Sequence, residues 1–114
     1  MSYKSERLRS LYLKEITSII QNEVKDPKLG FVTVSDVALS ADNSLAKVYV
    51  TFLGKDERNE AGLKVLDRAK GYIRSELAKR LKVYKVPELR FMIDDSLKRA
   101  ERIEAIIDKI NNDK

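Results

Sequence analysis

The chain has 114 residues and a net charge of +5, a length that suits one domain, residues 1–114, with one modest hydrophobic core. It contains no Cys and no His, which excludes disulfides and cysteine-ligated metal centres and removes the usual general base, so an enzyme is a minority hypothesis. No apolar run reaches the length of a membrane span or of a signal-peptide core, so we expect a cytoplasmic protein without a membrane segment.

The N-terminal half predicts one helix followed by two strands. Apolar residues recur at three- and four-residue steps and place an amphipathic helix over about 3–25. Residues 31–40 have strand composition, but their apolar positions change parity, so we expect a β-bulge near Ser35 and Asp36. Residues 45–53 alternate cleanly between apolar and polar. The two strands should therefore form an antiparallel hairpin.

The C-terminal half predicts a long helical segment, a third strand and a last helix. Asp56 is a plausible N-cap for a helical pattern that runs to about Lys82, and residues 88–94 read as a strand. Asp95 or Ser96 should cap the last helix. Its apolar positions are Leu97, Ala100, Ile103, Ile107 and Ile110. This order predicts an α+β fold, with a three-stranded sheet and helices packed mainly on one face.

Gly71 stands inside the long helical pattern, where Ala would be more stable by about 1 kcal/mol. The apolar stripe of this segment is formed by Leu66, Ala69, Ile73, Leu77 and Leu81. Lys70 falls inside that stripe, so a straight helix would point its ammonium at the core. We therefore predict a bend at Ala69, Lys70 and Gly71 that divides the segment into two helices. The alternative is that Lys70 reaches the surface from an unbroken helix that tolerates the glycine.

The excess positive charge lies in one segment. Between Lys64 and Lys85 the net charge is +6, and the rest of the chain is close to neutral at −1. An anionic partner fits this pattern, with nucleic acid ahead of a membrane surface because no strongly apolar face accompanies the charge; a solvated helix face is the alternative. The candidate RNA-binding residues are Lys70, Arg74, Lys79, Arg80, Lys82 and Lys85.

Two further features of this segment could assist RNA binding. A helix that begins just past Gly71 would add unpaired backbone N–H groups at the positive end of its dipole. Tyr72 and Tyr84 are candidates for stacking on bases, although such side chains also commonly pack at a helix edge.

Nothing else in the sequence specifies a catalytic, nucleotide or metal site. The four glycines form neither a G-x-G-x-x-G motif nor a P-loop, so we expect no bound nucleotide or other cofactor. Asp94 and Asp95 are the only tempting carboxylate pair, and we interpret them as helix caps. A small hydrolase that uses this pair, or a metal held by it, would need further ligands that the sequence does not specify.

Three stretches together resemble one known family, the bacterial ribosome-binding factor A proteins. They are KDPKLGFVTVSDVALSADNSLAKVYVTFLG, RAKGYIRSELAKRLKVYKVPELRF and DDSLKRAERIEAII, and with them the resemblance covers nearly the whole chain. It implies a K-homology-like fold of type II. In that variant an Ala-x-Gly kink between two helices, here Ala69, Lys70 and Gly71, replaces the Gly-x-x-Gly loop of ordinary K-homology domains.

The resemblance also implies a function. Members of this family are non-enzymatic assembly factors that bind the small (30S) ribosomal subunit, contact 16S ribosomal RNA, assist late maturation including 5′-end processing, and take part in cold adaptation. We expect a monomer that recognises folded RNA through shape and phosphates, because the Gly-x-x-Gly loop is missing. The alternative from the residues alone is a protein-interaction module that uses the long amphipathic helices.

Overall fold

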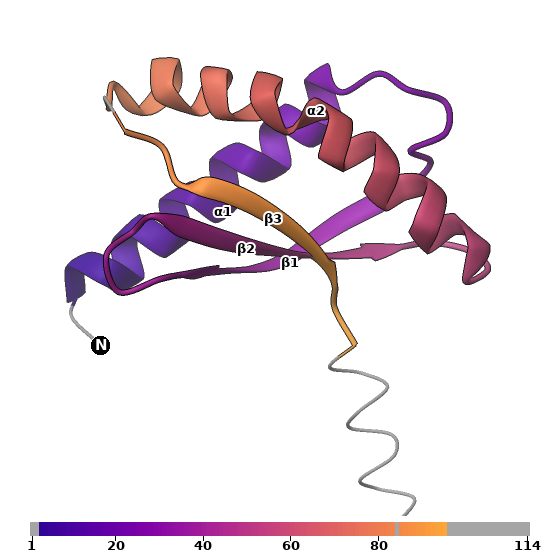
Figure 1. Cartoon of the computed structure of the whole chain (residues 1–114), viewed down its shortest axis with the longest axis horizontal. Helices are drawn as coiled ribbons and strands as arrows, with labels where there is room; N and C mark the ends of the chain where they lie inside the picture. Colours follow the sequence, from indigo (N-terminus) through magenta and orange to yellow (C-terminus); the bar gives the residue numbers. More distant parts are fainter. Residues whose placement is uncertain (1–2, 84, 96–114) are drawn as a thin grey trace, which may run out of the picture.

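The computed structural model describes residues 3–83 and 85–95, and these form an α+β structure (Figure 1). Its elements are α1 (Tyr3–Glu23), β1 (Val32–Leu39), β2 (Leu45–Phe52), α2 (Glu57–Leu81) and β3 (Glu88–Ile93). The predicted fold class is confirmed, and so is the order of the strands and of the first helix. The predicted last helix, from Ser96 onwards, and Tyr84 lie outside the described residues.

The three strands form one sheet in the order β1-β2-β3. β1 and β2 pair antiparallel, as predicted, while β2 and β3 pair parallel. The predicted bulge is confirmed, because Val34 pairs with Val50 and Asp36 with Tyr49, which leaves Ser35 as the extra residue. The bulge changes the parity of β1, so Val34 and Val37 both face the core.

Both helices pack on the same face of the sheet, with α1 against β1 and α2 against β2 and β3 (Figure 1). The hydrophobic core lies between the two layers. Its fully buried members include Ile16, Ile19 and Ile20 from α1, Val48 and Val50 from β2, and Leu66, Ile73 and Leu77 from α2. The burial of alternate residues in β2 follows from this arrangement, since the other residues of the strand point to the opposite face.

α2 is a single helix of 25 residues that continues through Gly71. The predicted division into two helices is therefore wrong, and Figure 1 shows that α2 changes direction near its middle without a break. Leu66 and Ile73 are fully buried on either side of Gly71. Each buried side chain contributes about 1.5–3 kcal/mol, which outweighs the cost of one glycine in a helix.

The alternative interpretation of Lys70, that its side chain reaches the surface from an unbroken helix, is confirmed. Its side chain is 43% exposed, and its ammonium lies 3.1 Å from a carboxylate oxygen of Asp67. The long aliphatic part of the side chain lets the charge reach the surface from an unbroken helix.

The two ends of α2 are capped differently. Asp56 occupies the N-cap position, as predicted, but its side chain makes no capping hydrogen bond to the helix. At the other end Lys82 adopts the left-handed conformation, with φ of 52°, and its backbone N–H donates to the carbonyl oxygen of Ala78. The chain then turns toward β3.

Candidate nucleic-acid interface

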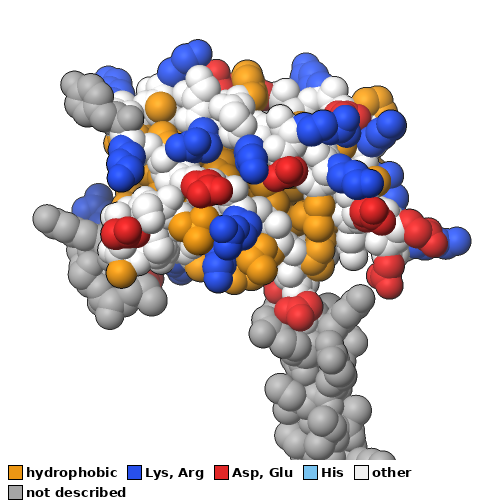
Figure 2. Space-filling model, in the orientation of Figure 1, with side chains coloured by type: hydrophobic (Ala, Val, Ile, Leu, Met, Phe, Trp, Pro, Cys, Tyr) orange, Lys and Arg blue, Asp and Glu red, His pale blue; other side chains and the backbone are white. Residues whose placement is uncertain are grey.

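A line of exposed residues runs along the side of α2 that is opposite the buried stripe. Its members recur at three- and four-residue steps, which keeps them on one side of a helix. We call it the cationic stripe, and it consists of Lys64, Arg68, Gly71, Ser75, Lys79 and Lys82, all of which are exposed. Figure 2 shows Lys and Arg side chains spaced along the part of the surface that α2 forms, with acidic side chains among them. The cationic stripe itself contains four cations and no acid.

The middle of the cationic stripe carries two small residues, Gly71 and Ser75. A Cβ atom added to Gly71 would meet nothing within 4 Å, so the helix backbone is directly accessible there. Gly71 borders a hollow of about 530 Å³ between α2 and β3, which is also lined by Asp67, Arg68, Lys70, Arg74, Glu88 and Leu89. A ligand backbone can therefore approach the helix closely at Gly71 with cations on both sides.

The backbone at Gly71 offers no free N–H groups of a helix N-terminus. Because α2 continues through this position, the amides that follow Gly71 lie in the interior of the helix. The predicted contribution of a second helix dipole is therefore wrong. The side chains of the cationic stripe, rather than backbone amides, supply the positive charge.

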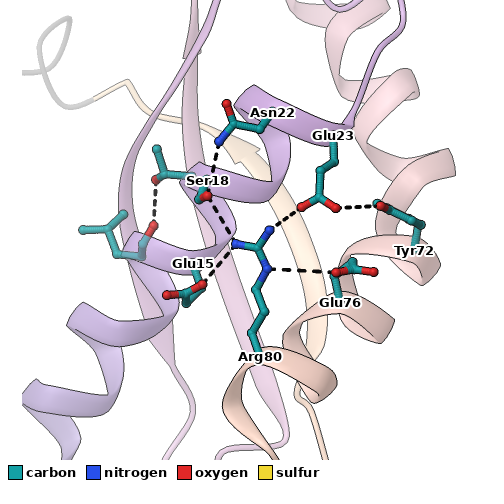
Figure 3. Close-up of polar contacts among 9 residues, drawn as sticks. Glu15, Ser18, Asn22, Glu23, Tyr72, Glu76 and Arg80 are labelled. Atoms are coloured by element: carbon teal, nitrogen blue, oxygen red, sulfur yellow. Dashed lines mark hydrogen bonds and ion pairs between the residues drawn. The ribbon is translucent and has the colours of Figure 1, made fainter.

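Arg80 joins α2 to α1 and does not belong to the cationic stripe (Figure 3). Its Nη1 lies 3.1 Å from Oε2 of Glu15 and donates to the hydroxyl of Ser18 at 3.2 Å. Its Nη2 donates to the carboxylate of Glu23, and its Nε lies 4.0 Å from Oε2 of Glu76. The hydrogen bond with Glu15 and the nearby carboxylates raise the pKa of Arg80. With three carboxylates around one guanidinium, Arg80 positions α2 against α1 and is a weak candidate for RNA binding.

Tyr72 takes part in the same cluster (Figure 3). Its hydroxyl donates to Oε1 of Glu23 at 2.8 Å, and this hydrogen bond is the main cause of a raised pKa for the phenol. Tyr72 thus helps to hold α2 against α1. This contact is the helix-edge role that the sequence left open for Tyr72.

Arg74 also has a positioning role, on the opposite side of α2. Its Nε donates to the carbonyl oxygen of Pro87 at 3.0 Å and its Nη2 to that of Val86 at 2.9 Å. These hydrogen bonds hold the segment before β3 against α2. The guanidinium is largely committed to the fold, so it is a weak candidate for RNA binding.

The predicted lysines remain at the surface. Lys79 is 72% exposed and lies 3.6 Å from Glu76, and Lys70 pairs with Asp67. Such exposed pairs contribute about 0–1 kcal/mol, so a phosphate can replace the carboxylate at little cost. Lys82 and Lys85 are exposed after the end of α2. The six predicted residues therefore divide into two arginines that position the fold and four lysines that are accessible.

Sequence reasoning missed two members of the cationic stripe, Lys64 and Arg68. Lys64 lies 3.3 Å from Glu60, and Nε of Arg68 donates to the carbonyl oxygen of Lys64 at 3.4 Å. Lys64 precedes Gly71 by seven residues and Arg68 precedes it by three, and this spacing places all three on the same side of one helix. The predicted break at Gly71 assigned Lys64 and Arg68 to a separate helix, so their alignment with the residues after Gly71 was not recognised.

The carboxylate of Asp94, just after β3, is held by a side chain of β1. Asp94 accepts a hydrogen bond of 2.6 Å from the hydroxyl of Ser35. Within residues 3–83 and 85–95, no group of three or more potential metal ligands comes together. No helix in the same described part is long and apolar enough to cross a membrane. The interpretation of Asp94 and Asp95 as caps depends on the last helix and stays a prediction.

Comparisons with known proteins agree with the resemblance seen in the sequence. A family model described as ribosome-binding factor A matches residues 4–107. The ribosome-binding factor A of Macrococcus caseolyticus (strain JCSC5402) is 43% identical over 114 residues, which is 100% of both chains.

Two structural relatives come from Thermus thermophilus. The crystal structure of ribosome-binding factor A from this organism has a TM-score of 0.71 and 30% identity, covering 78% of this chain and 93% of that one. A homology model of the Thermus thermophilus factor, fitted into a cryo-EM map of its complex with 30S, has a TM-score of 0.66 and 30% identity over the same shares of the two chains. The chain described here belongs to the ribosome-binding factor A family.

Proposed function

We propose that this protein is a non-catalytic assembly factor that binds the small ribosomal subunit, with the cationic stripe against 16S ribosomal RNA. Membership of the ribosome-binding factor A family supports the ribosome as partner, and the Thermus thermophilus relative fitted into a map with 30S supports the small subunit. The observation that carries the RNA contact is the cationic stripe, with its four exposed cations and its small central residues.

The geometry of the cationic stripe suits a run of phosphates. From Lys64 to Lys82 the stripe is about 27 Å long at the helical rise of 1.5 Å per residue. Cations at both ends can each pair with a phosphate, while Gly71 and Ser75 leave room for the RNA backbone between them. Contacts to phosphates fix position and orientation but carry no base sequence, so selectivity would come from the shape of the folded RNA.

Binding would act on the RNA without any bond chemistry by the protein. A factor that binds one arrangement of the RNA more tightly than another shifts the population toward that arrangement. We propose that this shift assists late maturation of the small subunit, including processing at the 5′ end of 16S ribosomal RNA. The protein would act in the cytoplasm as a monomer, with residues 1–114 as one RNA-binding domain.

Co-sedimentation of the full chain with small subunits at two ionic strengths tests this proposal. We expect the variant Lys79→Glu/Lys82→Glu to bind more weakly and to lose about 2 from the slope of log affinity against log salt, because each lysine at a phosphate accounts for about 1. The control Lys14→Glu/Lys25→Glu makes the same charge change on exposed residues in and just after α1. It should bind like the parent protein.

Two outcomes contradict the proposal. Full binding by a folded Lys79→Glu/Lys82→Glu variant would remove the cationic stripe from the interface, and an equal loss in both variants would show an effect of net charge alone. Binding that does not depend on salt would favour the alternative function, a module that contacts ribosomal proteins.

A further inference from the structure

The face of the sheet turned away from α1 and α2, which we call the open face, is uncovered in the described part of the chain. Thr33 and Thr51 lie exposed on it as register partners. Val48 and Val50 are fully buried on either side of Tyr49 in β2, so alternation places Tyr49 on the open face. Polar residues on such a face are ordinary, so its charged and aromatic residues are the informative ones.

Two cations stand directly opposite each other on the open face. Lys47 of β2 and Arg90 of β3 are register partners, and both alternate with core-facing residues of their strands. Within the described residues neither makes an ion pair, although Glu88 is exposed two positions before Arg90 on the same face. Like charges directly opposite each other destabilise a sheet. An anion bound between the two side chains would remove this repulsion.

Two aromatic side chains lie along the same face. Tyr49 is half-buried in the middle of β2, and Phe31 is 79% exposed at the end of the hairpin. Phe31 is paired with Leu53, whose N–H donates to its carbonyl oxygen at 3.0 Å. Their neighbours Val32 and Phe52 pack on the core side, so alternation directs Phe31 and Leu53 to the open face. Exposed hydrophobic side chains gathered in this way mark a contact surface.

We propose that the open face binds a short stretch of single-stranded RNA, with a phosphate between Lys47 and Arg90 and bases stacked on Tyr49 and Phe31. Unpaired bases stack on aromatic side chains presented by a sheet, and cations bind the RNA backbone. From Lys47 to Leu53 the face is about 20 Å long at 3.4 Å per residue, which gives room for several nucleotides. An apolar protein segment would bury two like charges without a partner, at a high cost. The inference rests on RNA as the partner proposed above, but not on the cationic stripe.

An NMR titration of the ¹⁵N-labelled full chain with octauridylate, an RNA single strand, tests the proposal residue by residue. We expect chemical-shift changes at the amides of Lys47, Tyr49 and Leu53. The same changes should appear in the Lys79→Glu/Lys82→Glu variant, so this proposal and the cationic stripe can fail separately. Changes confined to α2, or none on the open face, would overturn the proposal.

Variants of the two aromatic residues separate base stacking from an apolar contact. Tyr49→Leu and Phe31→Leu should each weaken octauridylate binding about 5- to 100-fold, because each removes one stacking ring. The controls Tyr49→Phe and Phe31→Tyr keep the ring and should bind like the parent protein. Equal binding by the leucine variants and their controls would assign the face to an apolar contact and overturn the proposal.

The cation pair gives a test in which binding and stability change in different directions. Lys47→Met keeps a long side chain and removes the charge, so binding of octauridylate should weaken. The denaturation midpoint should not fall, because the repulsion between Lys47 and Arg90 is gone. The control Lys14→Met, at an exposed position of α1, should bind like the parent protein. A lower midpoint with unchanged binding would give Lys47 a purely structural role and overturn the proposal.

Discussion

The two glycines of α2 serve opposite purposes, and they divide the helix into two regions. Gly62 is buried, and a Cβ atom there would lie 2.1 Å from Cε1 of Phe52, so its absence lets the helix lie directly on the sheet. Gly71 faces open space. Gly62 allows close packing of the helix on the sheet, and Gly71 leaves the helix surface open.

Both regions bury apolar side chains, and the second half also carries two arginines that contact neighbouring elements. The first half of α2 packs closely on the sheet, with Gly62 against Phe52. The second half buries Ile73 and Leu77 and adds polar contacts, from Arg80 to α1 and from Arg74 to the segment before β3. The lysines of the cationic stripe make no such contacts: Lys64 and Lys79 pair with carboxylates of their own helix and stay exposed. A basic residue therefore shows its role only through its neighbours.

The largest expected effect is a loss of stability when Gly62 is replaced. Gly62→Ala should destabilise the protein by about 1–3 kcal/mol, because the new methyl group forces the buried ring of Phe52 or the helix to move. Chemical denaturation of the full chain measures this change. A variant as stable as the parent would show that the close approach at Gly62 is not needed.

A smaller loss of stability is expected when the contacts of Arg80 with α1 are removed. Arg80→Gln leaves Glu15, Glu23 and Glu76 near one another without the guanidinium between them, so the denaturation midpoint should fall. The neighbouring variant Lys79→Gln removes the same charge but only one exposed pair, and its midpoint should hardly move. Equal midpoints for the two variants would contradict the assignment of Arg80 as a positioning residue.

Substitution of Gly71 should change the stability of the protein in the opposite direction from substitution of Gly62. Gly71→Ala has space for its methyl group in an exposed helix and should stabilise the protein by about 0.5–1 kcal/mol. The same methyl group would stand where a ligand backbone approaches, so binding to small subunits should weaken. Ser75→Ala is the control, since it adds no bulk to the cationic stripe. Tighter binding by Gly71→Ala would contradict the proposed close approach.

The smallest expected effect concerns pH. The hydrogen bond to Glu23 raises the pKa of Tyr72, so this contact stabilises the fold below the ordinary tyrosine pKa and is lost as pH rises through the higher folded value. Burial also raises the pKa of Tyr12, so ultraviolet titration should show two phenols that ionise above the usual range. Tyr72→Phe should remove one of these two late phenols and leave that of Tyr12, and an unchanged titration curve would place the shift elsewhere.

The sequence predicted the features that depend on residues close together in the chain. The change of parity near Ser35 predicted the bulge, and the spacing of apolar residues in α2 predicted which side of the helix is buried. At Gly71 only part of the prediction was wrong: α2 changes direction near its middle (Figure 1), but it stays one helix, with Leu66 and Ile73 buried on either side of the glycine. The role of Arg80 depends on Glu15 and Glu23, which only the packing of α1 on α2 brings near. The close contact at Gly62 is made by Phe52 at the end of β2, and only the packing of α2 on the sheet brings the two together.

The most direct test of the two proposed roles, lysines that contact RNA and arginines that hold the fold, compares how binding depends on salt in two variants. For binding to small subunits, replacing Lys79 and Lys82 by Gln should lower the slope of log affinity against log salt by about 2, while replacing Arg74 and Arg80 by Gln in a folded protein should leave it unchanged. The reverse result, with the slope lost only in the arginine variant, would contradict the assignment of the cationic stripe as the RNA contact.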